Sequence, residues 1–170
     1  MRYRIVIVLI SMVINYAVHS EDLTLEMKPV INLSLAKIMA NACEEDQKKS
    51  GYNPVNIAIV DDGGDLVLFR RQDKAFLLSI DIAQKKARSS AGIPYPTRKI
   101  EEIVYGKKDG KTGRAPGLAH SKDVVAFAGG LPIKTNNGDL IGAIGVSGAT
   151  ADQDEQCASA AIKAIEKVLK

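Results

Sequence analysis

The sequence predicts an α+β domain in which helices cover a five-stranded, mainly antiparallel sheet. Four stretches carry apolar residues at helical spacing and five short stretches are apolar and rich in β-branched residues, in the order α-β-β-α-α-β-β-β-α. Tight-turn residues join neighbouring strands, and too few helices separate the strands for the crossovers of a parallel sheet. Both observations favour antiparallel pairing.

Residues 1–20 have the pattern of a signal peptide. Two arginines precede an apolar run at residues 5–14, which is about half of the roughly 20 residues that span a bilayer. Val18-His19-Ser20 suits cleavage before Glu21. An uncleaved N-terminal anchor is the alternative. We expect a mature domain of residues 21–170 that is periplasmic or secreted.

Composition narrows the functional classes. Removing the two arginines of the first 20 residues lowers the formal net charge from +3 to +1. With no Trp, three Phe and five Tyr, the chain has neither the charge nor the aromatic side chains of a nucleic-acid binder. No later apolar segment is long enough to cross a membrane, so no stable membrane insertion is expected after cleavage.

Two cysteines, Cys43 and Cys157, each lie in a predicted helix beside alanines. An oxidising compartment would allow them to pair, and two buried free thiols are the alternative.

The first helix is predicted over residues 24–50. Pro29 marks its first turn or a kink, and Gly51 ends it. Its apolar stripe consists of Ile31, Leu35, Ile38 and Ala42. A hairpin follows, with strands at 55–60 and 66–69. The acidic, glycine-containing turn between them lacks the ligand spacing of a calcium loop.

A second helix is predicted to begin at Asp73 as its N-cap and to end at Gly92. Its expected buried face consists of Phe76, Ile80, Ala83, Ala87 and Ala91. A short third helix is expected to be capped by Thr97 and to end at Gly106. Its apolar face is Ile100, Ile103 and Val104.

A polar loop occupies residues 107–117. Its Gly110-Lys111-Thr112 triplet is similar to the end of a phosphate-binding loop. The first glycine of that motif is missing at the required spacing, and no strand precedes the loop, so we expect no nucleotide site.

Three further strands are predicted at 124–128, 131–134 and 140–146. Gly129-Gly130 and Asn136–Asp139 are the expected turns between them.

The final helix begins with the capping box Thr150-Ala-Asp-Gln153. Asp152, Asp154 and Glu155 lie in its first turn, where they suit the helix dipole and would repel an anion. The glycine-rich stretch 142–148 before it fits neither a serine elbow nor a phosphate loop. It is better explained as a strand that a helix or a second subunit approaches closely.

Few residues in the mature chain suggest chemistry. His120 is its single histidine, so a protein zinc site is not expected. It is either a surface loop residue or a ligand, for example to haem iron. Lys86 is either a solvated lysine near the end of its helix or a functional one. Asp81 and Gln84 share a helix face, and Asp81 is the one candidate metal ligand there.

Six segments of the chain, taken in order, resemble one known family. They are Ile57–Gly64 with Leu66, Ala83–Ala87, Tyr95–Thr97, Phe127–Ile133, Asn137–Gly148 and Gln153–Ala158. The family is the GlcG/HbpS-like haem-binding family, whose domain also follows some cobalamin adenosyltransferases. The resemblance covers nearly all of residues 23–168.

The resemblance implies a profilin-like α-β-α sandwich that assembles as a homo-oligomer, often an octamer. It also implies haem binding, which in some exported members is linked to haem or iron sensing. The candidate haem-contacting residues that it suggests in this chain are His120, Met27, Lys86, Thr97, Gly129 and Gly130. An iron-binding glutamate pair of the family corresponds here to Asp81 and Gln84.

Two departures from the family pattern concern the ligands. Val124 stands at the position that aligns with a polar haem contact of the family, and the first segment has Met27 and Met39 where other members carry a histidine. Three functions are therefore weighed. The first is an exported haem-binding protein that uses His120 or a methionine at a subunit contact. The second is a binder of a small organic acid beside Lys86 and the Gly129-Gly130 turn. The third is an enzyme of unknown reaction.

Overall fold

The computed structural model of the protein describes residues 25, 27–107 and 109–170. The predicted signal peptide at residues 1–20 and its cleavage site before Glu21 lie outside these residues. The bounds of the helices and strands are α1 Leu33–Ser50, β1 Asn56–Asp61, β2 Leu66–Arg71, α2 Ser79–Gly92, α3 Thr97–Tyr105, β3 Gly130–Lys134, β4 Leu140–Ser147 and α4 Ala151–Ala164, with short 3-10 helices η1 Pro116–His120 and η2 Glu166–Val168.

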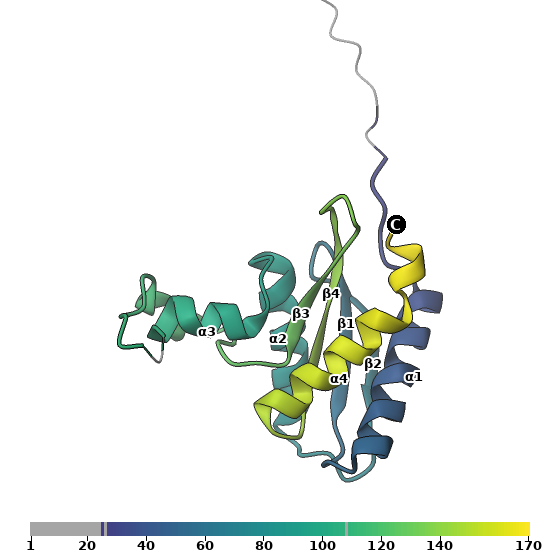
Figure 1. The fold of residues 1–170 in the computed structure, drawn as a ribbon, viewed down its shortest axis with the longest axis horizontal. Coiled ribbons are helices and arrows are strands. Elements are labelled where there is room, and N and C mark those ends of the chain that lie inside the picture. Colours follow the sequence, from purple (N-terminus) through teal and green to yellow (C-terminus); the bar gives the residue numbers. More distant parts are fainter. Residues whose placement is uncertain (1–24, 26, 108) are drawn as a thin grey trace, which may run out of the picture.

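The four strands form one antiparallel sheet in the order β2-β1-β4-β3 (Figure 1). The two predicted hairpins, β1–β2 and β3–β4, are confirmed. Central β1 is buried on both faces because Ile57 and Ile59 belong to one core cluster, and Ala58 and Val60 to another. This explains its continuous apolar sequence.

The predicted fifth strand at 124–128 is wrong. This segment runs beside α2 without joining the sheet. The Oγ of Ser89 accepts a hydrogen bond from the backbone N–H of Val125 at 2.8 Å and donates to the carbonyl of Asp123 at 3.3 Å. A helix side chain therefore provides the hydrogen bonds that a neighbouring strand would have made.

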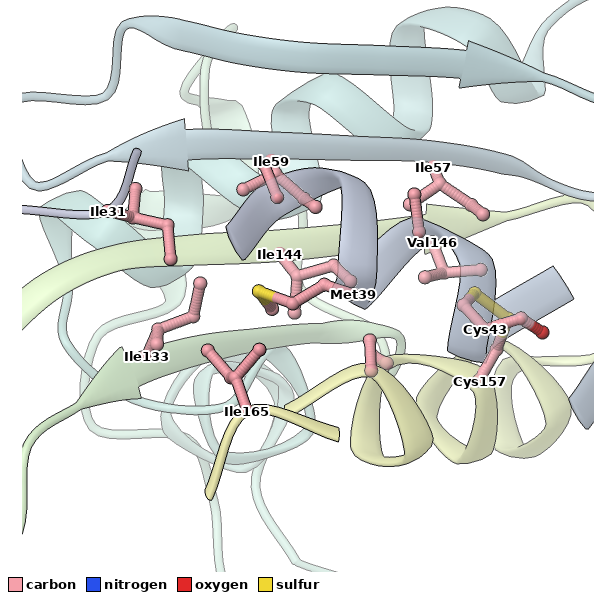
Figure 2. Packing of buried hydrophobic residues seen from close by; sticks show 14 of the residues in the cluster. Ile31, Met39, Cys43, Ile57, Ile59, Ile133, Ile144, Val146, Cys157 and Ile165 are labelled. Atoms are coloured by element: carbon pink, nitrogen blue, oxygen red, sulfur yellow. A yellow bond between two sulfur atoms is a disulfide. The ribbon is translucent and has the colours of Figure 1, made fainter. Parts of the chain in front are cut away.

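Helices α1 and α4 lie side by side on one face of the sheet (Figure 1). Figure 2 shows the core between them and the sheet, where Met39 of α1 lies among isoleucines of the strands and of the C-terminal segment. Cys43 and Cys157 form a disulfide that joins the two helices. Of the two states left open by the sequence, the structure therefore has the paired one.

Helix α2 covers the opposite face with alanines. Ala83, Ala87 and Ala91 are buried there as predicted, and the small side chains bring α2 close to β4. Gly145 of β4 has no room for a Cβ, because the carbonyl of Ala83 already occupies that position. The close helix approach predicted for the glycine-rich strand is thus confirmed, and α2 is the helix.

The predicted starts of the three helices α1, α2 and α3 need correction. Helix α1 begins at Leu33, not residue 24, because the side chain of Asn32 accepts a hydrogen bond from the N–H of Leu35 at 3.0 Å. Pro29 therefore precedes the helix. Helix α2 begins at Ser79, and the side chain of Phe76 in the preceding turn is 61% exposed instead of buried.

Thr97 is the first residue of α3 and not its cap. The predicted ends at Gly51 and Gly106, and the capping box at Thr150 and Gln153, are confirmed. Helix α3 and the loop after it project away from the sheet (Figure 1). No helix among the described residues is long and apolar enough to span a membrane.

Candidate functional site

A pocket of about 500 Å³ opens where the N-terminal ends of α2 and α4 meet the end of β4. Its walls are mostly apolar. Phe76, Leu77 and Leu78 supply one wall from the turn before α2, and each is more than half exposed. Phe127 supplies another wall from the segment before β3, so the pocket offers a solvent-facing apolar surface.

The pocket is backed by a buried ion pair. Asp154 of α4 lines the pocket, and one of its oxygens lies 2.8 Å from the Nζ of Lys86 in α2. The other carboxylate oxygen of Asp154 accepts a hydrogen bond from the backbone N–H of Ala149 at 3.0 Å. Lys86 is fully buried, so of the two alternatives left open by the sequence the solvated one does not hold.

The contacts known around the ammonium of Lys86 all come from the protein itself, and two of its three N–H donors are used in hydrogen bonds. Its Nζ donates to the carbonyl of Val146 at 2.9 Å and to Asp154, and it lies 4.5 Å from the centre of the Phe127 ring. Burial lowers the pKa of Lys86, while the carboxylate of Asp154 opposes that shift. Burial likewise raises the pKa of Asp154 against the opposing effect of Lys86. Each charge therefore depends on the other to remain ionised.

Two glycines allow close packing around Lys86, one at its ammonium and one at its backbone. Gly129 has φ +119°, and a Cβ there would lie 2.5 Å from the Nζ of Lys86. A Cβ at Gly130 would lie 2.6 Å from both the backbone carbonyl of Lys86 and the Cγ2 of Thr97. The hydroxyl of Thr97 accepts a hydrogen bond from the N–H of Gly130 at 2.8 Å, which fixes the start of β3.

Four of the predicted site residues therefore lie together: Lys86, Thr97, Gly129 and Gly130. The other three predicted residues do not join them. His120 is exposed at the last position of η1, and Met27 is 92% exposed ahead of α1. Asp81 lies on an exposed face of α2 and pairs with Lys85 at 2.8 Å.

Sequence reasoning missed Asp154 as the partner of Lys86. It was expected to serve only the dipole of the final helix. Its spacing carried a signal, because positions 154, 157, 158 and 161 fall on one helix face, and all four residues are buried. In the same way, Lys86 lies three residues after Ala83, on the predicted apolar face of its helix.

The pocket suits the faces of a flat apolar ring and provides no iron ligand. Its lining contains aromatic and leucine side chains, while no histidine, methionine, cysteine or tyrosine is among the described residues that line it. No group of three or more potential metal-binding side chains occurs in the described part of the chain. A haem here would be held by its ring, and an iron ligand would have to come from elsewhere.

Comparison with known proteins places the chain among related sequences. A family model described as "Haem degrading protein HbpS-like" matches residues 31–163. An uncharacterised 15.0 kDa protein of Citrobacter freundii is 37% identical over 132 residues, which are 78% of this chain and 89% of that protein. Protein GlcG of Escherichia coli K12 is 34% identical over 123 residues, covering 72% and 85% of the two chains.

The fold also resembles a solved structure that contains haem. A crystal structure of a PduOC:heme complex superposes with a TM-score of 0.69 at 28% sequence identity. The match covers 80% of this chain and 95% of that one. The sequence matches thus cover 72–78% of this chain, and the structural match covers 80% of it.

Proposed function

Because the chain belongs to the HbpS-like family, we propose that it is an exported haem-binding protein whose apolar pocket receives the porphyrin ring. The family has haem-binding members, as the PduOC:heme complex illustrates. The observation that carries the proposal for this chain is the exposed apolar wall formed by Phe76, Leu77, Leu78 and Phe127. Apolar and aromatic walls of this kind are typical of cofactor pockets.

The iron ligand is proposed to come from a second copy of the chain. The pocket lies beside Ser79 at the start of α2, whereas Ser89 near its end holds the segment that follows His120. Ten helical residues separate these points by about 15 Å. The exposed imidazole of His120 would therefore reach the pocket from a neighbouring subunit of a homo-oligomer. The thioether of Met27, which is 92% exposed and does not line the pocket, is the alternative donor from such a subunit.

Export is supported by the disulfide. Disulfides persist in oxidising compartments and are rare in the cytosol. Cys43 and Cys157 form one here. Together with the signal-peptide pattern of residues 1–20, the disulfide favours a periplasmic or secreted protein.

Binding of a small organic acid is less well supported. That function would use the ammonium of Lys86 to hold a ligand carboxylate. Asp154 already provides that carboxylate, and Phe127 and Val146 occupy the other directions around Nζ. A ligand acid would have to displace a buried internal ion pair.

Haemin titration of the purified protein, followed by absorption, tests the proposal. A saturable Soret band is expected. Leu77→Ser or Phe127→Ser should weaken binding about tenfold, the effect of losing about 1.4 kcal/mol of apolar contact. Ile38→Ser is the matched control, because Ile38 is an exposed apolar residue of α1 that does not line the pocket.

The position of the Soret maximum tests which residue is the iron ligand. If His120 is the ligand, His120→Ala should shift the Soret maximum while the ring still binds and Met27→Ala should leave it unchanged; if Met27 is the ligand, the two results are exchanged. A titration that never saturates, or one that the pocket substitutions leave unchanged, would overturn the proposal.

A further inference from the structure

A second pocket, of about 220 Å³, lies on the projecting part of the molecule formed by α3 and the loop after it. Half of its eight lining residues are cationic: Lys99, Lys107, Lys111 and Arg114. Glu102 is the single carboxylate among them. The sequence motif Gly110-Lys111-Thr112 places two of its residues, Lys111 and Thr112, in this lining.

The loop that carries these cations is folded tightly against α3. The N–H of Lys107 donates to the carbonyl of Lys111 at 2.9 Å, and the N–H of Ala115 donates to Ile103 at 3.0 Å. A Cβ at Gly106 or Gly113 would overlap backbone atoms across this contact. The backbone around the pocket is therefore fixed by close packing.

The charges of the pocket are only partly compensated. Glu102 lies 2.7 Å from Lys99 and 3.9 Å from Lys107, and its hydrogen bond with Lys99 lowers its pKa. The Nζ of Lys111 lies 3.6 Å from a carboxylate oxygen of Asp109. Arg114 makes no ion pair or hydrogen bond with any described residue. A positive excess thus remains around a concave surface.

The cationic side chains of the pocket are not needed to cap the C-terminal end of α3. The last turn of α3 contains no basic side chain. Two carbonyls of that turn accept hydrogen bonds from the chain itself, Glu102 from the N–H of Gly106 and Ile103 from the N–H of Ala115. Capping of the helix dipole therefore does not explain why Lys111 and Arg114 gather here.

We propose that this pocket binds a phosphate group, either as inorganic phosphate or pyrophosphate or as part of a small phosphate ester. The guanidinium of Arg114 supplies a forked donor that matches phosphate oxygens, while Lys107, Lys111 and the hydroxyl of Thr112 add donors around it. At about 30 Å³ for each water, the volume corresponds to roughly seven waters. This space accommodates a phosphate group, and because the pocket is open to solvent the rest of an ester would lie outside it.

The site can be tested without knowing the natural ligand. The full-length protein is titrated at low ionic strength with inorganic phosphate, pyrophosphate and glycerol phosphate in parallel, and backbone amide shifts are recorded by NMR. Saturable shifts confined to residues 111–114 and their neighbours are expected. The ligand with the lowest Kd distinguishes free phosphate, pyrophosphate and an ester.

Paired variants separate a site from general charge. Arg114→Gln should raise the Kd at least tenfold, whereas Lys134→Gln removes the same charge at the distant end of β3 and should change the Kd less than twofold. Arg114 is exposed, so its replacement should leave the thermal unfolding curve unchanged. Shifts that never saturate, that sodium chloride reproduces at equal ionic strength, or that both variants weaken equally would overturn the proposal.

Discussion

Lys86 shows how one buried charge can join several parts of a fold. Its ammonium contacts a carbonyl of β4, a carboxylate of α4 and the ring of Phe127, although the lysine itself belongs to α2. Each of these contacts lies within or directly behind the apolar pocket. The shape of the pocket therefore depends on a residue that is fully buried.

Lys86→Met should lower the free energy of unfolding by about 3–5 kcal/mol, because the carboxylate of Asp154 would stay buried without its partner. Urea denaturation at neutral pH measures this change. Replacing both partners, with Lys86→Met and Asp154→Leu together, should recover part of the loss, since no unpaired charge would remain.

Lys85 provides the matched control for this substitution. It is the next residue along α2 and pairs with the exposed Asp81 on the surface. Lys85→Met should change stability by less than about 1 kcal/mol. Equal effects of the two substitutions would contradict the role assigned to the Lys86 pair.

At the scale of the elements, helix and sheet approach each other to backbone distance. Helix α2 rests on β4 at Gly145, where the carbonyl of Ala83 and the N–H of Ala87 occupy the place of a side chain. This contact sets the spacing between the helix and the sheet. It also fixes Lys86, which lies between the two alanines, beneath the pocket.

Gly145→Ala should destabilise the protein by about 1–3 kcal/mol, because the new methyl group must push α2 away from β4. Gly92→Ala at the end of α2 is the control, since a Cβ there meets nothing within 4 Å. That substitution should be neutral or raise stability by up to about 1 kcal/mol. Thermal unfolding of both variants checks the expectation, and a harmless Gly145→Ala would show that the helix can shift freely.

At the level of elements, the sequence was informative where the signal is local. Turn residues predicted both hairpins, and the capping box placed the start of α4 within one residue. The segment 124–128 is not a strand, and the N–H of Val125 donates to the side chain of Ser89 in α2 instead of to a neighbouring strand. Such a distant side chain cannot be recognised from local periodicity.

The candidate site was predictable only in part, because its residues come from distant parts of the sequence. Lys86, Thr97, Gly129 and Gly130 were selected from the family resemblance, and the fold gathers them. Asp154 was missed because its partner lies 68 positions away in the sequence. The pocket walls at 76–78 were also missed, since the predicted helix start placed Phe76 in the core.

On the scale of the whole molecule, the disulfide is the longest-range covalent constraint. It links Cys43 and Cys157 across 114 positions, so it restricts most of the described chain in the unfolded state. Reduction, or the paired Cys43→Ala and Cys157→Ala substitution, should lower the free energy of unfolding by about 2–5 kcal/mol. Urea denaturation with and without reductant measures the loss.

The alanine pair also serves as the control for the reductant. Added reductant should have no further effect on this variant. If reductant destabilised it as much as the natural chain, the loss could not be assigned to the bond between α1 and α4.

The same bond has a consequence for the projecting loop between α3 and η1. That loop lies between the two cysteines in the sequence and stands away from the body of the protein. A protease that cuts it once would leave an N-terminal fragment carrying Cys43 and a C-terminal fragment carrying Cys157. The fragments would still migrate as one species on a non-reducing gel and would separate only when thiol is added. A nicked molecule can therefore keep its sheet, its α1–α4 core and its apolar pocket in one covalent unit.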